Sequence, residues 1–197
     1  MRHEAIVIGA SVGGWEALKT LLSALPASFP SPIAIVQHIG ERSESFMAEL
    51  LNQVSRIAVK EAEDKESLSS GTAYLAPPGY HLLIEPDRSF SLSVDERVNH
   101  ARPSIDVLFE SAAEVFGGTL IGIILTGANA DGARGLKTIK EYGGLAIVQN
   151  PDDAENPTMP KAALTATEVD YIVSLQQLTT ILFQLTAQEE KIHDTNG

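Results

Sequence analysis

The chain has 197 residues, of which 44% are hydrophobic, and its formal net charge is −12 at pH 7. This length is sufficient for one sizeable core, no apolar run is long enough to span a membrane, and the acidic balance argues against a nucleic-acid partner, because phosphate binding needs a cationic face. The absence of cysteine excludes disulfides and thiolate chemistry and agrees with a reducing cytoplasm.

The chain opens on a short apolar run that leads into a glycine-rich turn. Residues 5–8 predict a strand that starts too early for a signal peptide. Gly9, Ser11 and Gly13 then meet the pattern Gly-x-Ser-x-Gly, and leucines at helical spacing follow them. A serine on a strand-to-helix turn has the geometry of a nucleophile elbow, in which helix amides face the developing negative charge. A serine hydrolase, a nucleotide site and an ordinary tight turn all fit this segment.

Apolar, β-branched runs recur along the chain and predict strands buried on both faces of a parallel sheet. They lie at residues 6–8, 33–36, 121–125, 145–148 and 171–173. Stripes at helical spacing predict helices between and after them, formed by Phe46, Met47, Leu50, Leu51 and Val54, by Ile105, Leu108, Phe109, Ala112 and Phe116, and by Leu175, Leu178, Leu182 and Leu185. We interpret the polar residues from Gln188 onward as a frayed tail.

The stretch from Thr72 to Val94 has a different pattern. Three short apolar runs, at residues 74–76, 81–84 and 90–92, are joined by turns and predict an antiparallel hairpin insertion. The expected fold class is α/β: a doubly wound, mostly parallel sheet with helices on both faces and this hairpin. Ligands are expected at the carboxyl ends of the parallel strands.

Three of these strand ends carry side chains that together suit nucleophilic catalysis. The first strand leads to Ser11, the second to His38, and the run that ends at Leu125 leads to Asp131. A nucleophile, a general base and an orienting carboxylate require these residue types, provided that the strands are neighbours. Taken singly, His38 is explained as a hydrogen-bonded residue at a strand end, and Asp131 as a turn or helix-start residue. Their joint placement at one sheet edge favours catalysis.

Two other families have a similar glycine turn and fit less well. Residues 9–14 resemble the turn of short-chain dehydrogenases, but Ser11 occupies the place of the second glycine and the second strand ends in Gln37-His38 rather than an acidic residue. The α/β-hydrolase fold has several strands before its elbow and its histidine last. A nucleotide-binding protein of the dehydrogenase type remains an alternative.

Four motifs in order resemble the catalytic domain of the chemotaxis protein-glutamate methylesterases (CheB type). They are Ile8 to Gly14, Val36 to His38, Arg102 to Phe109 and Ile124 to Gly135, with support from residues 60–64, 73–79 and 159–160. The resemblance implies a catalytic domain over residues 1–190, a polar tail over 191–197 and no receiver domain. It also implies hydrolysis of glutamate methyl esters, and deamidation of glutamines, on a methyl-accepting chemoreceptor or a similar methylated protein. The expected location is the cytoplasm, with membrane contact only through the receptor.

Matched motif by motif, the resemblance implies Ser11 as nucleophile, His38 as base and Asp131 as orienting carboxylate. We expect the oxyanion to be held at the helix start and by the loop after the strand that ends at Leu125. The residues assigned to the oxyanion or the substrate are Val12, Gly13, Thr126, Gly127, Ala128, Asn129 and Arg102. Arg102, Arg42 and Arg134 are expected to offset the negative charge of the surface where a receptor helix docks. Alternatively, each of them is an ordinary solvated arginine on the surface. No metal and no cofactor is expected.

Two departures from the family pattern concern the site itself. Val12 stands where the family usually has threonine, and Ala128-Asn129 stands where Met-Gly is common. The first removes a hydroxyl near the nucleophile, and the second changes the slot for the substrate chain. A receptor-binding module that has lost turnover is therefore an alternative, against which the intact serine, histidine and aspartate count.

Overall fold

A seven-stranded sheet forms the centre of the computed structural model, which describes residues 3–38 and 46–186. Its strand order is β3-β4-β2-β1-β7-β8-β9, and every neighbouring pair runs parallel. The strands are β1 (Ala5–Ala10), β2 (Ile33–Gln37), β3 (Ala58–Glu61), β4 (Thr72–Leu75), β7 (Leu120–Ile124), β8 (Leu145–Gln149) and β9 (Tyr171–Val173). A separate antiparallel pair consists of β5 (His81–Ile84) and β6 (Phe90–Ser93).

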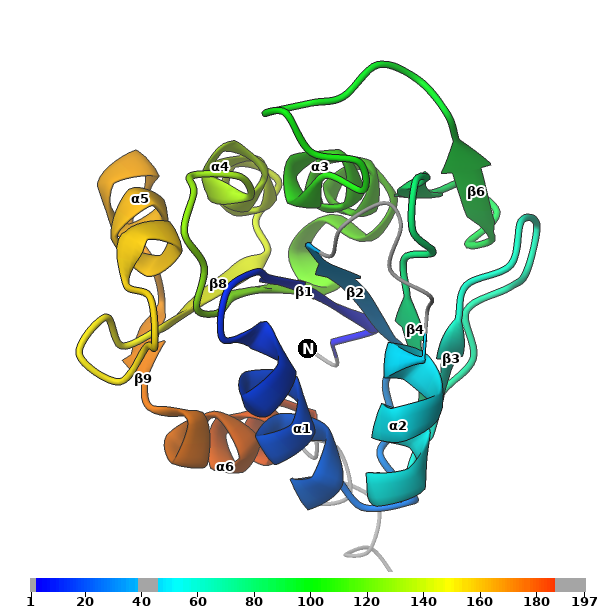
Figure 1. Ribbon diagram of the computed structural model, residues 1–197, viewed down its shortest axis with the longest axis horizontal. Coiled ribbons are helices and arrows are strands. Elements are labelled where there is room, and N and C mark those ends of the chain that lie inside the picture. Colours follow the sequence, from blue (N-terminus) through cyan, green and yellow to red (C-terminus); the bar gives the residue numbers. More distant parts are fainter. Residues whose placement is uncertain (1–2, 39–45, 187–197) are drawn as a thin grey trace, which may run out of the picture.

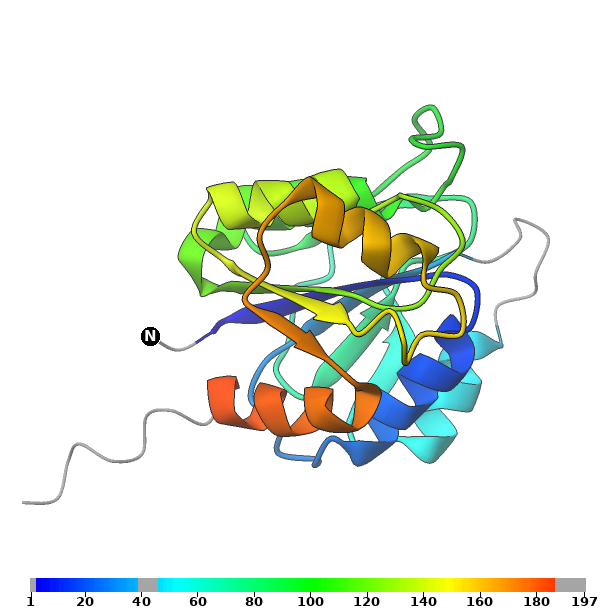
Figure 2. The same ribbon diagram turned by 90° about the vertical axis from the view of Figure 1, so that its left-hand side faces the viewer.

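Helices cover both faces of the sheet (Figures 1 and 2). One layer contains α3 (Ile105–Phe116), α4 (Ala133–Glu141) and α5 (Thr158–Ala166), and the other contains α1 (Gly14–Ala24), α2 (Met47–Val54) and α6 (Leu175–Thr186). A short 3₁₀ turn, η1 (Gly117–Thr119), joins α3 to β7. Alternate residues of β1 enter the two cores, Val7 with the α3 layer and Ile8 with the α1 layer. The expected doubly wound fold is confirmed.

The predicted hairpin is too long at its start. Residues 72–75 form β4, which pairs in parallel with β2 and β3 in the main sheet, so only β5 and β6 make the antiparallel hairpin. Ala73, Tyr74 and Leu75 are all buried, as expected for a strand covered on both faces. Strand β3 was not predicted, since it is only four residues long and lies at the edge of the sheet.

The helix predictions differ from the structure in two respects. In α2 the expected buried stripe is wrong, because Phe46, Leu50 and Val54 are 55%, 45% and 44% exposed and the buried face consists of Ala48 and Leu51. Helices α4 and α5 were not predicted, because each presents only a few apolar side chains to the core. In the described ranges the longest helices have 12 residues, too short to cross a bilayer. The expected tail at 191–197 and Arg42 lie outside these ranges.

Candidate active site

The loops that follow β1, β2 and β7 meet at one edge of the sheet. The His38 N–H donates to the Ala10 carbonyl at 3.0 Å, and the Ser11 N–H donates to the Thr126 carbonyl at 2.9 Å, so hydrogen bonding continues past the strand ends. Strand β1 lies between β2 and β7, where the chain turns from one half of the sheet to the other. Ligands of open α/β sheets bind at such a switch point.

Ser11 occupies a tight turn between β1 and α1. The Gly14 N–H donates to the Ser11 carbonyl at 2.8 Å, and Gly13 has φ +79°, a left-handed conformation that favours glycine. A Cβ on Gly14 would collide with the side-chain amide of Gln37. The Ser11 side chain lies against Gly127, where an added Cβ would come 3.0 Å from the Ser11 Cβ. The two glycine-rich loops therefore pack closely around a partly exposed serine.

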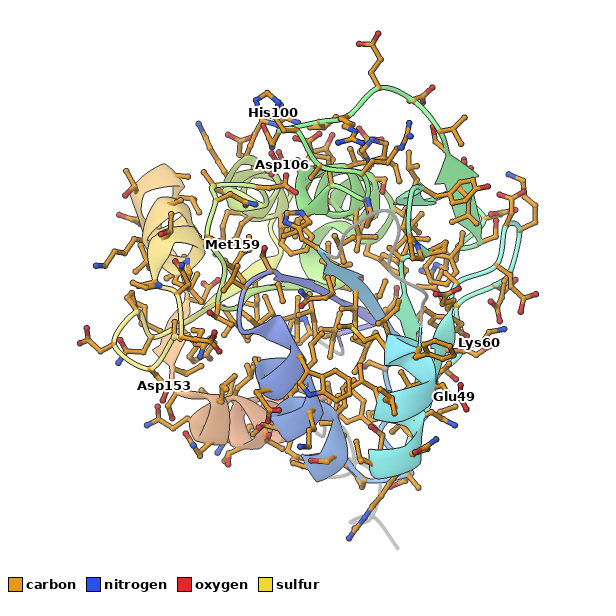
Figure 3. The ribbon with its side chains drawn as sticks, in the orientation of Figure 1. Glu49, Lys60, His100, Asp106, Asp153 and Met159 are labelled. Atoms are coloured by element: carbon orange, nitrogen blue, oxygen red, sulfur yellow. The ribbon has the colours of Figure 1, made fainter. Side chains whose placement is uncertain are left out.

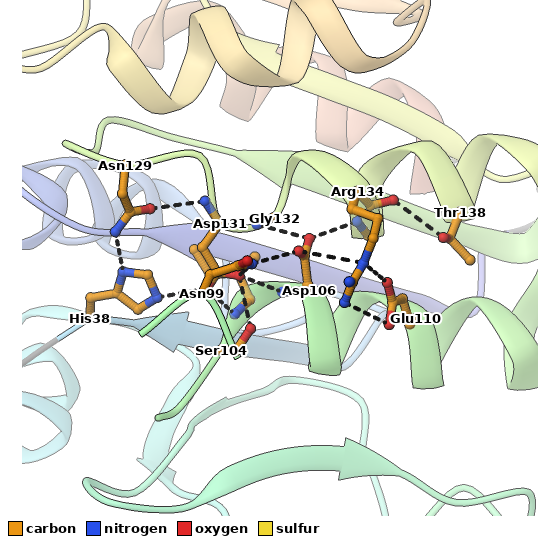
Figure 4. A network of polar contacts seen from close by, with 12 residues as sticks. His38, Asn99, Ser104, Asp106, Glu110, Asn129, Asp131, Gly132, Arg134 and Thr138 are labelled. Carbon is orange, nitrogen blue, oxygen red and sulfur yellow. Dashed lines mark hydrogen bonds and ion pairs between the residues drawn. The ribbon is translucent and has the colours of Figure 1, made fainter. Parts of the chain in front are cut away.

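His38 is held at both ring nitrogens (Figure 4). Its Nε2 lies 2.9 Å from Asp131 Oδ2, and its Nδ1 lies 3.2 Å from Asn129 Nδ2. Because an amide nitrogen only donates, Nδ1 is the acceptor and Nε2 carries the hydrogen toward Asp131. The ring nitrogen without a hydrogen is therefore Nδ1, and its lone pair accepts from Asn129. The structure shows no hydrogen bond between the Ser11 hydroxyl and His38, both of which are among the described residues.

Asp131 is only 1% exposed, and its carboxylate accepts several hydrogen bonds. Besides His38, its donors are Asn99 Nδ2 and the Ser104 hydroxyl, both at 2.8 Å, and the N–H groups of Ile105 at 2.6 Å and Asp106 at 3.3 Å. Burial on its own raises the pKa of Asp131, but the hydrogen bonds from His38, Asn99, Ile105 and Ser104 together hold this pKa below its ordinary value. Asp131 is therefore an anion at neutral pH and able to stabilise a protonated imidazole.

A second buried carboxylate, Asp106, lies beside Asp131 at the start of α3, facing α4 (Figures 3 and 4). Its Oδ1 accepts the N–H groups of Gly132 and Gly135 at 3.0 and 2.7 Å, and its Oδ2 accepts from Asn99 at 2.8 Å. Asn99 thus bridges both carboxylates. Asn99 was not predicted as a site residue; in the structure it adopts a left-handed φ of 52°, which asparagine tolerates.

Two buried glutamines bind the loops that follow β1, β2 and β7. Gln37, at the end of β2, donates from Nε2 to the carbonyls of Ser11 at 2.8 Å and His38 at 3.0 Å. Gln149, at the end of β8, accepts the Thr126 N–H at 2.8 Å through Oε1. Gln37 belongs to a motif used in the sequence analysis, but this bridging role was not foreseen.

The residues assigned to the oxyanion separate into two groups. The amides of Thr126 and Gly127 donate within the protein, to Gln149 at 2.8 Å and to the Asn156 carbonyl at 3.1 Å. Within the described part of the chain, the amides of four other residues donate to no protein group, namely Val12, Gly13, Ala128 and Asn129. Each of these four residues therefore has a main-chain N–H group that can donate to a ligand. The Thr126 hydroxyl donates to the Val12 carbonyl at 2.8 Å and thereby joins the two loops.

The expected docking arginines make contacts within the chain. Arg102 donates from Nη1 to the carbonyls of Val94 and Asp95 at 2.7 and 3.0 Å, which fastens the loop between β6 and α3. Arg134 pairs with Glu110 at 2.6 Å and is 59% exposed. Both therefore stabilise loops or helices near the site in this structure.

Comparison with known proteins gives consistent matches along the chain. Residues 6–182 match the model of the CheB methylesterase family. A Leptospira interrogans protein, provisionally named a protein-glutamate methylesterase/protein-glutamine glutaminase, is 57% identical over 185 residues, which cover 94% of this chain and 96% of the relative. A Syntrophus aciditrophicus protein of the same name is 41% identical, and the match covers 89% of this chain but 52% of the relative. The crystal structure of the Thermotoga maritima CheB methylesterase catalytic domain superposes with a TM-score of 0.88 at 32% identity, covering 94% of this chain and all of that domain.

Proposed function

This chain belongs to the CheB methylesterase family of protein-glutamate methylesterases, and we propose that Ser11, His38 and Asp131 carry out its reaction. The observation that supports these roles most strongly is the 2.9 Å bond from His38 Nε2 to the buried Asp131 carboxylate. This bond selects the tautomer whose Nδ1 is free of hydrogen. Ser11 follows the adjacent strand, on the turn that begins α1.

The first half of the reaction forms an acyl-enzyme. His38 Nδ1 removes the proton of the Ser11 hydroxyl as its oxygen attacks the carbonyl carbon of a glutamate methyl ester. Main-chain amides of Val12 and Gly13, with one from the Ala128-Asn129 segment, stabilise the oxyanion; in other enzymes one such donor contributes roughly 2.7–4 kcal/mol. Protonated His38 then donates its proton to the leaving methoxide oxygen, and methanol departs. Asp131 stabilises the imidazolium throughout.

Water completes the reaction. It attacks the Ser11 ester while His38 takes its proton, and the proton returns to the serine oxygen as the substrate protein's glutamate side chain leaves with its carboxyl group restored. A glutamine side chain enters the same sequence with ammonia as the leaving group, which accounts for the second activity in the names of the relatives. No step requires a group outside the chain other than water.

The substrate that we propose is a methyl-accepting chemoreceptor or a similar methylated protein. Its signalling helices lie in the cytoplasm, so the enzyme is placed there and contacts the membrane only through the receptor. Val12 is 48% exposed beside Ser11 and offers an apolar contact for a docking helix. We take residues 1–190 as the methylesterase domain.

Methanol release from methylated receptor membranes tests this function. The intact chain should release methanol, and Ser11→Ala should release none above background, while Ser23→Ala on the exposed side of α1 should match the unmodified chain. Methanol release by Ser11→Ala at most of the normal rate would eliminate the serine mechanism. Binding of receptor without any methanol release by the intact chain would favour the non-catalytic module.

A further inference from the structure

The Asn129 side chain makes two hydrogen bonds that fix its orientation. Its Oδ1 accepts the Asp131 N–H at 3.0 Å, so its Nδ2 is the atom that faces His38, 3.2 Å from Nδ1. An imidazole Nδ1 without hydrogen has one lone pair, and Asn129 already uses it. Since Nε2 is bound to Asp131, both ring nitrogens of His38 are occupied.

This arrangement conflicts with the first step of the reaction. The Ser11 hydroxyl must donate to the same Nδ1 lone pair, and in the described structure it makes no bond to His38. We propose that Asn129 is a positioning residue that latches the general base: its amide holds His38 Nδ1 in the resting enzyme and must be displaced before Ser11 is activated. The inference rests on the proposed function, since it concerns the proton that His38 takes from Ser11.

The surroundings of Asn129 allow such a displacement. Asn129 is partly exposed and lies between the exposed residues Ala128 and Ala130, whereas the two ends of this loop are fastened. At one end the Gly127 N–H is bonded to Asn156, and at the other the Asp131 carboxylate is bonded at the start of α3. The amide can therefore leave Nδ1 by side-chain rotation while the loop ends stay fixed, and this rotation also releases the Asp131 N–H. The bond to His38 alone corresponds to a rate effect of about two- to tenfold.

Two substitutions that preserve the turn separate the latch from a merely structural role. In Asn129→Ser the hydroxyl still accepts the Asp131 N–H but is too short to reach His38. The second-order rate of inactivation by a serine-directed phosphonate, and kcat for methanol release, should rise about two- to tenfold with KM unchanged. In Asn129→Asp the turn acceptor also remains, but a carboxylate oxygen faces Nδ1 and binds the ring only when Nδ1 carries a proton. Both rates should then fall below those of the unmodified enzyme.

Asn150 provides the matched control. Its Oδ1 accepts the Asp152 N–H at 3.1 Å in an equivalent asparagine turn, so Asn150→Ser removes an amide from such a turn without affecting His38. Its rates should be unchanged. In ¹⁵N spectra of histidine-labelled enzyme, the Nδ1 resonance of His38 should move in Asn129→Ser and stay in place in Asn150→Ser.

Asn129→Ser rates at or below the normal value, with an unmoved Nδ1 resonance, would overturn the latch. A phosphonate that inactivates the intact enzyme through Ser11 but reacts no faster with Asn129→Ser would refute the latch alone. Normal methanol release by Ser11→Ala would instead refute the proposed function.

Discussion

Asp131 and Asp106 each cap the helix that begins beside the other residue. Asp131 Oδ2 accepts the N–H of Ile105 at the start of α3, and Asp106 Oδ1 accepts the N–H groups of Gly132 and Gly135 at the start of α4. Helix N-termini leave N–H groups without partners and favour negative charge. The orienting carboxylate of the proposed triad is therefore fixed by the helix packing itself.

Removal of the second carboxylate should weaken both the fold and the site. Asp106→Ala leaves the Gly132 and Gly135 N–H groups buried without an acceptor, so the free energy of unfolding in urea should fall by about 1–3 kcal/mol. The rate of methanol release should fall with it, since Gly132 adjoins Asp131. Glu110→Ala, on the same helix, removes only the partly exposed pair with Arg134 and should change stability by less than about 1 kcal/mol. Equal stability of both variants would contradict the reciprocal capping.

The contribution of Asp131 to stability should depend on pH. Its pKa in the folded protein lies below the ordinary value of 3.8, so folding is stabilised above that value, and this stabilisation is lost as the pH falls through the folded pKa. The difference in unfolding free energy between the intact chain and Asp131→Asn should be on the order of 1–3 kcal/mol at pH 7. It should shrink as the pH is lowered toward and below 3.8. A difference that stays constant with pH would show that the charge of Asp131 is not involved.

Gln37 should affect turnover more than substrate binding. Gln37→Met keeps a similar volume but removes the N–H donors that bind the Ser11 and His38 carbonyls. Small misplacement of reacting groups costs up to about a hundredfold in rate, so kcat should fall by roughly ten- to a hundredfold with a much smaller change in KM. Gln53→Met on the exposed side of α2 is the control and should behave normally. A normal kcat for Gln37→Met would show that the strands alone hold the two loops.

Gly127 should tolerate no larger side chain. A Cβ there would lie 2.5 Å from Met159 Cε and 3.0 Å from Ser11 Cβ, so Gly127→Ala should lower stability by about 1–3 kcal/mol and displace Ser11. Adding Met159→Ala removes the closer contact, and the double variant should regain part of the lost methanol release. A fully active Gly127→Ala would contradict the close packing of the two loops.

The sequence was sufficient to predict the central strands and that the loops carrying Ser11, His38 and Asp131 meet, because buried parallel strands have a strong apolar pattern and their ends lie at one edge. It could not show that residues 72–75 join the main sheet, since a four-residue apolar run is the same in a hairpin and in a parallel strand. Asn99 and the Asn129–His38 contact were also beyond it. Asn99 and Asp131 lie 32 residues apart in the sequence, and Asn129 and His38 lie 91 residues apart. Such pairs are brought together only by tertiary packing.

Mass spectrometry after reaction with a serine-directed phosphonate tests the central claim most directly. We expect a single adduct, located on Ser11, whose formation parallels the loss of methanol release and is strongly slowed in His38→Gln. An enzyme that still releases methanol with Ser11 fully modified, or an inactivating adduct on a different residue, would contradict the assignment of Ser11 as the nucleophile.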